Sequence, residues 1–106
     1  MGTKNTNLDL IETDYYSFSK EKEKFLNEQR KISFNDIIEA ITEDGLIDII
    51  PNKNYKKQEM FIVKINKYVY VVPFEVRNNR FHLITVWPSS KAKKQYLKEG
   101  GVLYEN

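Results

Sequence analysis

Cysteine is absent from the 106-residue sequence, and histidine occurs only once, as His82. Without cysteine the chain can form neither a disulfide bond nor a thiolate metal site. A zinc site with one histidine would depend on carboxylate ligands, an uncommon arrangement, so we expect no metal and no other cofactor. Long apolar runs are also missing, and residues 1–10 lack the apolar core of a signal peptide. We therefore expect a cytoplasmic protein with no membrane partner.

The residues that are present suit a folded domain: 41% are hydrophobic and 30% are charged. A chain of 106 residues can bury one modest core but not two. The net charge of +2 is unevenly distributed, because residues 1–50 hold 6 basic and 11 acidic side chains while residues 51–106 hold 11 basic and 4 acidic ones. This asymmetry suggests a basic surface for an anionic partner, although a solvated surface with a chance asymmetry explains it nearly as well.

The first half of the sequence predicts a short strand followed by two helices. The aromatic residues at 15–18 favour a brief edge strand, and Ser19 can cap the first helix. Ser33 and Asp36 have the spacing of a capping box, which predicts the start of the second helix. Gly45 should end that helix, because glycine readily takes the left-handed conformation.

The second half predicts four strands and a final helix. The strands are expected at residues 46–50, 60–65, 68–74 and 81–87, and the helix at 90–98. Pro73 should mark a bulge or an edge position, because proline cannot donate to a strand ladder. The central strands are apolar on both faces, so helices should cover part of each side.

Helices first and an antiparallel meander afterwards predict an α+β fold with the order β-α-α-β-β-β-β-α. We expect one domain at residues 14–99, with a flexible lead at 1–13 and a tail at 100–106.

Several segments resemble, in their order, the BrnT family of toxins. They are FLNEQRKISF at residues 25–34, IIEAITEDGLIDI at 37–49, EMF at 59–61, YVYVVPF at 68–74 and WPSSKA at 87–92. The shared pattern is a basic residue ending the first helix, Ser-Phe opening the second, a four-stranded meander, and a small-basic-Ala box at the last helix. The resemblance spans about residues 15–98.

The resemblance implies a RelE-like fold and a metal-independent endoribonuclease acting on RNA, most simply mRNA. It also implies a DNA-binding antitoxin, usually of ribbon-helix-helix type, which neutralises the toxin and carries the complex to operator DNA. By position, the resemblance assigns site residues to Arg30, Glu59 and Lys91. The sequence departs from the family pattern at three positions, Lys31, Met60 and Ser90, where glycine, arginine and arginine occur in relatives.

Metal-free RNA cleavage needs a base, cations around the phosphate and an acid for the leaving oxygen. Lys91 and Lys94 are three residues apart on the last predicted helix and are candidates for phosphate binding, unless they belong to a solvated helix face. Arg30 could clamp the phosphate or simply complement the helix dipole. Glu59 is the candidate base, although it could instead pair with a neighbouring lysine.

Further RNA contacts are predicted at six positions: Lys53, Tyr55, Lys56, Lys57, Lys93 and Tyr96. Tyr55 could stack on a base within the Lys-rich loop, or be an ordinary exposed residue. Tyr96 could orient RNA or act as an acid, but a tyrosine on a docked helix is more often core. We interpret His82 and Trp87 as structural residues.

The sequence thus favours the toxin of a type II toxin–antitoxin pair that cleaves RNA and leaves a cyclic phosphate. One alternative is an inactive relative that binds antitoxin or nucleic acid without cutting, which Ser90 and Met60 would favour. A second is an interaction module that uses the same fold against a phage or host protein.

Overall fold

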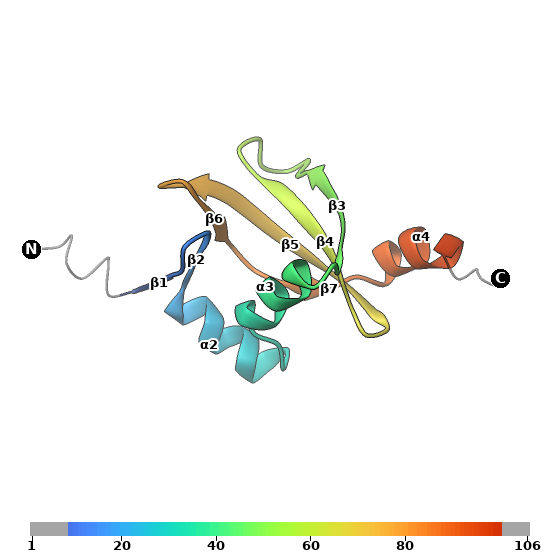
Figure 1. Cartoon of the computed structure of the whole chain (residues 1–106), viewed down its shortest axis with the longest axis horizontal. Coiled ribbons are helices and arrows are strands. Elements are labelled where there is room, and N and C mark those ends of the chain that lie inside the picture. The colour runs from blue at the N-terminus through green and yellow to red at the C-terminus, as the bar shows by residue number, and fades with distance from the viewer. Residues whose placement is uncertain (1–8, 101–106) are drawn as a thin grey trace, which may run out of the picture.

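The chain forms an α+β fold with three helices and a seven-stranded, mostly antiparallel sheet (Figure 1). The computed structural model describes residues 9–100. The helices are α2 (Lys20–Gln29), α3 (Phe34–Thr42) and α4 (Ser90–Gly100). The strands are β1 (Leu10–Glu12), β2 (Tyr16–Ser19), β3 (Leu46–Pro51), β4 (Glu59–Ile65), β5 (Tyr68–Arg77), β6 (Arg80–Leu83) and β7 (Trp87–Pro88). The predicted α+β class is therefore confirmed.

The sheet is built around the long hairpin of β4 and β5. Its spatial order is β1-β2-β6-β5-β4-β3, and the short β7 pairs with β5 beyond the end of β6. The turn between β4 and β5 places Asn66 at a φ of 57°, and the next turn places Asn78 and Asn79 at 52° and 62°. Asparagine tolerates this left-handed region better than most residues, which explains why both turns form without glycine.

Helices cover each face of the sheet, as the apolar character of its central strands predicts. Helices α2 and α3 lie on one face (Figure 1) and bury Leu26, Phe34 and Ile37 against strands β2, β4, β5 and β6. Helix α4 packs on the other face, where Ala92 is buried against Val69 and Val71 of β5. Both predicted caps are present, since Ser19 accepts a hydrogen bond from Lys22 N and Ser33 forms a capping box with Asp36. Alternating residues of β4 and β5 therefore belong to two different cores.

The N-terminal part of the sheet differs from the prediction. Strand β1 lies within the lead that was expected to be flexible, and it pairs with β2 in antiparallel register. Strand β2 is consequently not an edge strand, because β1 covers one side of it and β6 pairs with the other in parallel. Strand β1 has only three residues, Leu-Ile-Glu, which is too short a segment for periodicity to distinguish a strand from a loop. Residues 1–8 and 101–106 of the predicted lead and tail lie outside the described residues.

The strand predicted at residues 81–87 is wrong in its extent. It divides into β6 and β7, with residues 84–86 between them. Pro73 lies opposite this break: β5 pairs with β6 from Phe74 onwards and with β7 only as far as Val71. Proline has no N–H to donate, so a gap in the ladder beside it is physically expected.

The second helix ends differently from the prediction. Asp44, not Gly45, takes the left-handed conformation, with a φ of 73°, and no described glycine has a positive φ. Gly45 is instead needed for space, because a Cβ atom there would lie 2.7 Å from the carbonyl oxygens of both Ala40 and Lys64. The backbone of Gly45 donates to Ala40 and accepts from Lys64 N. This glycine therefore allows β3 to leave α3 in close contact with β4.

Candidate functional site

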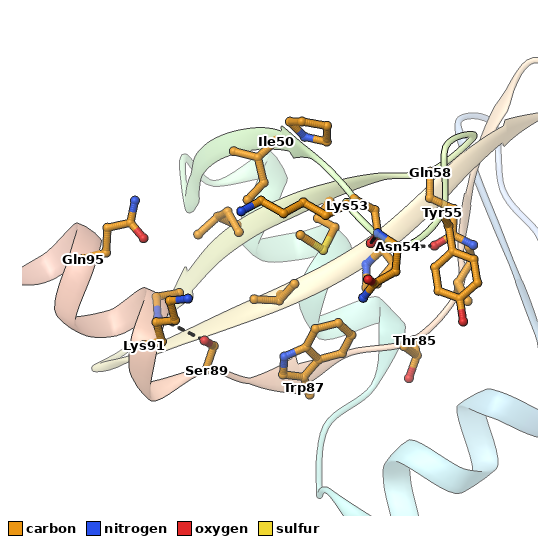
Figure 2. A pocket seen from close by; sticks show the side chains of 18 of the residues that line it. Ile50, Lys53, Asn54, Tyr55, Gln58, Thr85, Trp87, Ser89, Lys91 and Gln95 are labelled. Atoms are coloured by element: carbon orange, nitrogen blue, oxygen red, sulfur yellow. Dashed lines mark hydrogen bonds between the residues drawn. The ribbon is translucent and has the colours of Figure 1, made fainter.

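A groove of about 820 Å³ opens on the α4 side of the sheet (Figure 2). It lies between the loop that follows β3, residues of β4 and β5 on the face that α4 covers, residues 84–89, and the first turns of α4. Figure 2 shows Lys91 and Gln95 at one end of the groove, Tyr55 towards the other, and Trp87 lying between them. We call this feature the groove.

The loop at residues 52–58 forms one wall and is held by its own hydrogen bonds. Asn52 N donates to Gln58 O over 3.1 Å, and Gln58 N donates to Tyr55 O over 3.0 Å. The side chain of Asn52 makes two more bonds, donating to Gln58 Oε1 and accepting from Asn54 N, each at 3.0 Å. These bonds fix the loop and so position Lys53 and Tyr55, which both line the groove.

The break between β6 and β7 forms the opposite wall. Because residues 84–86 leave the regular ladder, Ile84 and Thr85 line the groove beside Pro73. Ile84 N still donates to Pro73 O over 2.9 Å, which keeps the broken segment attached to β5. Trp87 then returns to pair with Val71 and packs against the core beneath α4. The break therefore creates the space that the groove occupies.

Helix α4 closes one end of the groove. Its first turn is capped by Ser89, whose Oγ accepts from Ala92 N over 3.0 Å, so this backbone donor is already occupied. Ala92 and Tyr96 pack towards β5, which leaves Lys91 and Gln95 at the groove. Tyr96 also lines it, and its hydroxyl donates to Asp48 Oδ2 over 3.0 Å. Burial, followed by the hydrogen bond to Asp48, raises the pKa of Tyr96, so the phenol stays protonated at neutral pH.

The side chains lining the groove carry positive charge and no carboxylate. Lys53 and Lys91 are its two cations, and neither forms an ion pair with the described side chains, those of residues 9–97. The three aromatic rings are those of Tyr55, Trp87 and Tyr96. Uncompensated cations beside aromatic rings can attract phosphate groups and stack on bases.

Four of the predicted site residues meet at the groove: Lys53, Tyr55, Lys91 and Tyr96. Lys56 and Lys57 belong to the same loop and are exposed, but they do not line the groove. Lys93 lies outside it, with its Nζ 5.5 Å from the centre of the Tyr68 ring. Lys94 is also outside the groove. The α4 residues that line it, at positions 91, 92, 95 and 96, form one face of the helix, and Lys93 and Lys94 point away from that face in different directions.

Arg30 and Glu59 are not brought to the groove. Glu59 pairs with Phe74, whose ring belongs to the core under α2 and α3, so Glu59 faces the opposite side of the sheet. Arg30 lies at the end of α2, donates from Nη1 to the carbonyl of Val86, and packs over the ring of Phe25. Its observed role is to tie the helix end to the segment before β7. The two residues therefore do not form a single site with Lys91.

Trp87 and the amide residues of the groove are not predicted as site residues from sequence. Trp87 is both a core residue, as predicted, and part of the groove surface. Asn52 and Gln58 contribute by holding the loop, and an asparagine in a polar loop carries no signal of that role. Asn54 lines the groove with its side-chain amide free of hydrogen bonds to residues 9–100.

His82 has a structural role, as the sequence suggests. It is buried, and its Nδ1 lies 2.9 Å from Ser17 Oγ across the parallel pair of β2 and β6. Burial, and then the charge of Arg77, lowers the pKa of His82, so the ring is neutral at pH 7. This pair joins the N-terminal strands to the rest of the sheet.

Among the side chains of residues 9–97, no group of three histidines, cysteines, aspartates or glutamates is placed to hold a metal ion. Within residues 9–100 no helix is both long and apolar enough to cross a membrane. Comparison of the chain with models of protein families, with curated proteins and with solved structures finds no match, so the resemblance to BrnT stays a prediction.

Proposed function

We propose that this protein binds single-stranded RNA in the groove. The observation that carries the proposal is the combination of Lys53 and Lys91 with three aromatic rings and no carboxylate in one groove. Lysine side chains neutralise phosphates, and aromatic side chains stack on exposed bases. A volume of about 820 Å³ is also within the range of small-ligand sites, and so accommodates part of a strand.

A single strand fits this chemistry better than a duplex. The bases of a double helix are paired and stacked, so the rings of Tyr55 and Trp87 could not reach their faces. An unpaired segment exposes base faces and phosphates together, and the groove offers aromatic rings for the bases and lysines for the phosphates. The uneven charge of the chain agrees, since Lys53 and Lys91 come from its basic second half.

The test is RNA binding measured by fluorescence anisotropy with a labelled single-stranded oligonucleotide. The double variant Lys53→Ala/Lys91→Ala should bind about tenfold more weakly or worse, because two phosphate contacts are lost. The dependence of log Kd on log salt should also decrease by about 1.4, at about 0.7 for each contact to a single strand.

The matched control is Lys20→Ala/Lys24→Ala, which removes the same charge from the exposed side of α2, away from the groove. Its affinity should stay close to that of the wild type. If both double variants weaken binding equally, only net charge matters and the groove is not the site.

A second candidate function is cleavage of the bound RNA, the activity that the BrnT resemblance implies. The favouring observation is the Tyr96–Asp48 hydrogen bond at the groove, near Lys91 on the same helix. For cleavage, the phenol of Tyr96 would turn its O–H from Asp48 to the leaving 5′-oxygen, Asp48 would accept the proton of the attacking 2′-hydroxyl, and Lys91 would stabilise the phosphate. In this candidate the protein is a RelE-like toxin, and an antitoxin covers the groove until it is removed.

Cleavage predicts a separation between binding and turnover. Tyr96→Phe should abolish cutting of total RNA in the presence of EDTA, while oligonucleotide affinity changes by no more than about twofold. The measurement is a denaturing gel for cleavage, beside anisotropy for binding. Intact RNA after incubation with the wild-type protein, together with normal growth on induced expression, would leave RNA binding as the function.

A further inference from the structure

We infer that Trp87 is a stacking platform for one unpaired base, so that the groove recognises a nucleotide splayed out of a single strand. This inference rests on the proposed RNA-binding function. It adds a specific contact to that function, because phosphate binding by two lysines alone would require no base at all.

Trp87 has the placement that a stacking platform requires. Its backbone is held by pairing with Val71 of β5, and its side chain packs against the core that includes Ala92. The residue is half-buried and at the same time lines the groove (Figure 2). An indole that is fixed from behind loses little conformational entropy when a base stacks on it.

The surroundings of Trp87 suit a base better than they suit an aliphatic ligand. Met60 and Pro73 provide apolar surface in the same groove, while Lys53 and Lys91 come from different walls and can hold phosphates on either side of the base. The free amide of Asn54 can both donate and accept hydrogen bonds, as the edge of a base requires. Asn52 and Gln58 are already bonded to each other, so Asn54 is the amide of the loop that remains available.

The other aromatic rings are less suited to this role. The hydroxyl of Tyr96 is bonded to Asp48, and its ring packs under α4. Tyr55 is 60% exposed on the loop, so it can approach a second base but is not held by a core. Trp87 is therefore the aromatic side chain that loses the least conformational entropy when a base stacks on it.

The experiment uses the fact that Trp87 is the sole tryptophan of the chain. A short single-stranded RNA is titrated while intrinsic tryptophan fluorescence and the anisotropy of the labelled RNA are recorded in parallel. Stacking should quench the fluorescence, and quenching should saturate with the same Kd as the anisotropy. Trp87→Leu should weaken binding about tenfold or more, the range measured when a stacking aromatic is removed, whereas Trp87→Phe should retain most of the affinity.

A matched ligand separates base from phosphate. An oligonucleotide of the same length that lacks all its bases should bind the wild type at least about tenfold more weakly than normal RNA does, and Trp87→Leu should distinguish the two ligands much less than the wild type does. Circular dichroism verifies that the variants are folded. If Trp87→Leu is not, fluorescence quenching and the abasic ligand still test the inference on the wild-type protein.

The possible results are distinct. Binding without quenching, together with equal affinity for the abasic oligonucleotide, overturns the stacking inference and leaves the RNA-binding function standing. No anisotropy change with the wild-type protein overturns the proposed function itself. Quenching that follows binding and is lost with the abasic ligand supports both.

Discussion

Lys31 is the residue with the clearest mismatch between side chain and backbone. It follows the end of α2 with a φ of 56°, in the left-handed region where β-carbons clash with the backbone. The BrnT pattern that the sequence resembles has glycine at this position. The backbone at this position thus takes a conformation that glycine adopts without steric cost, although the residue in this chain is lysine.

Replacing this lysine should therefore stabilise the protein. Lys31→Gly removes the steric cost of the left-handed conformation and should raise the free energy of unfolding by up to about 1 kcal/mol, measured by urea denaturation. Lys24→Gly is the matched control, because Lys24 lies within α2, and it should lower that free energy by about 1 kcal/mol. Destabilisation by both variants would show that the lysine side chain itself holds this turn.

Single-residue signals in the sequence are reliable where the chemistry is local. Both serine caps are correctly predicted, because a hydroxyl and the next turn of backbone suffice to make them. The role of Gly45 is not, because the clash that demands glycine involves the carbonyl of Lys64, distant in sequence, as well as that of Ala40 in the preceding helix. Long-range constraints of this kind have no local signature.

At the scale of elements, the loop at residues 52–58 is the wall of the groove that is held by side-chain hydrogen bonds within itself. Its side-chain bonds from Asn52 to Gln58 and from Asn54 N hold the lysine and tyrosine in place. If the loop acts by preorganisation, loosening it should reduce affinity without removing any charge from the groove.

Asn52→Ala tests this role. It should lower RNA affinity a few-fold and leave the salt dependence of Kd unchanged, whereas Lys53→Ala should reduce that dependence by about 0.7. Anisotropy titrations at several salt concentrations measure both quantities. Asn35→Ala, on the exposed side of α3, is the control and should have no effect. A salt dependence that falls in Asn52→Ala would mean that Asn52 contacts the phosphate directly.

Periodicity predicts most elements but only part of the site. Runs of β-branched and aromatic residues correctly locate β3, β4 and β5, and helical spacing locates α2 and α3. These signals do not reveal that β4 turns Glu59 away from Lys91, because both faces of β4 are apolar and neither is marked as the functional one. The helix α4 presents Lys91 but not Lys94 for a similar reason: its docking on β5 decides which stripe is left open.

At the scale of the molecule, the two faces of the sheet have separate tasks. Helices α2 and α3 build the main core on one face and carry five of the eleven acidic residues of the first half of the chain. The other face is only partly covered by α4, and the groove occupies the remainder. An anionic ligand should therefore bind on the α4 face of the sheet and leave the face covered by α2 and α3 unchanged.

The most direct measurement of this claim is a titration of ¹⁵N-labelled protein with a short single-stranded RNA, followed by NMR. Amide shifts should change at residues 52–60 and 84–97, the segments that border the groove, and stay constant in α2 and α3. Shifts concentrated on α2 and α3, or spectra that do not change at any RNA concentration, would contradict the account.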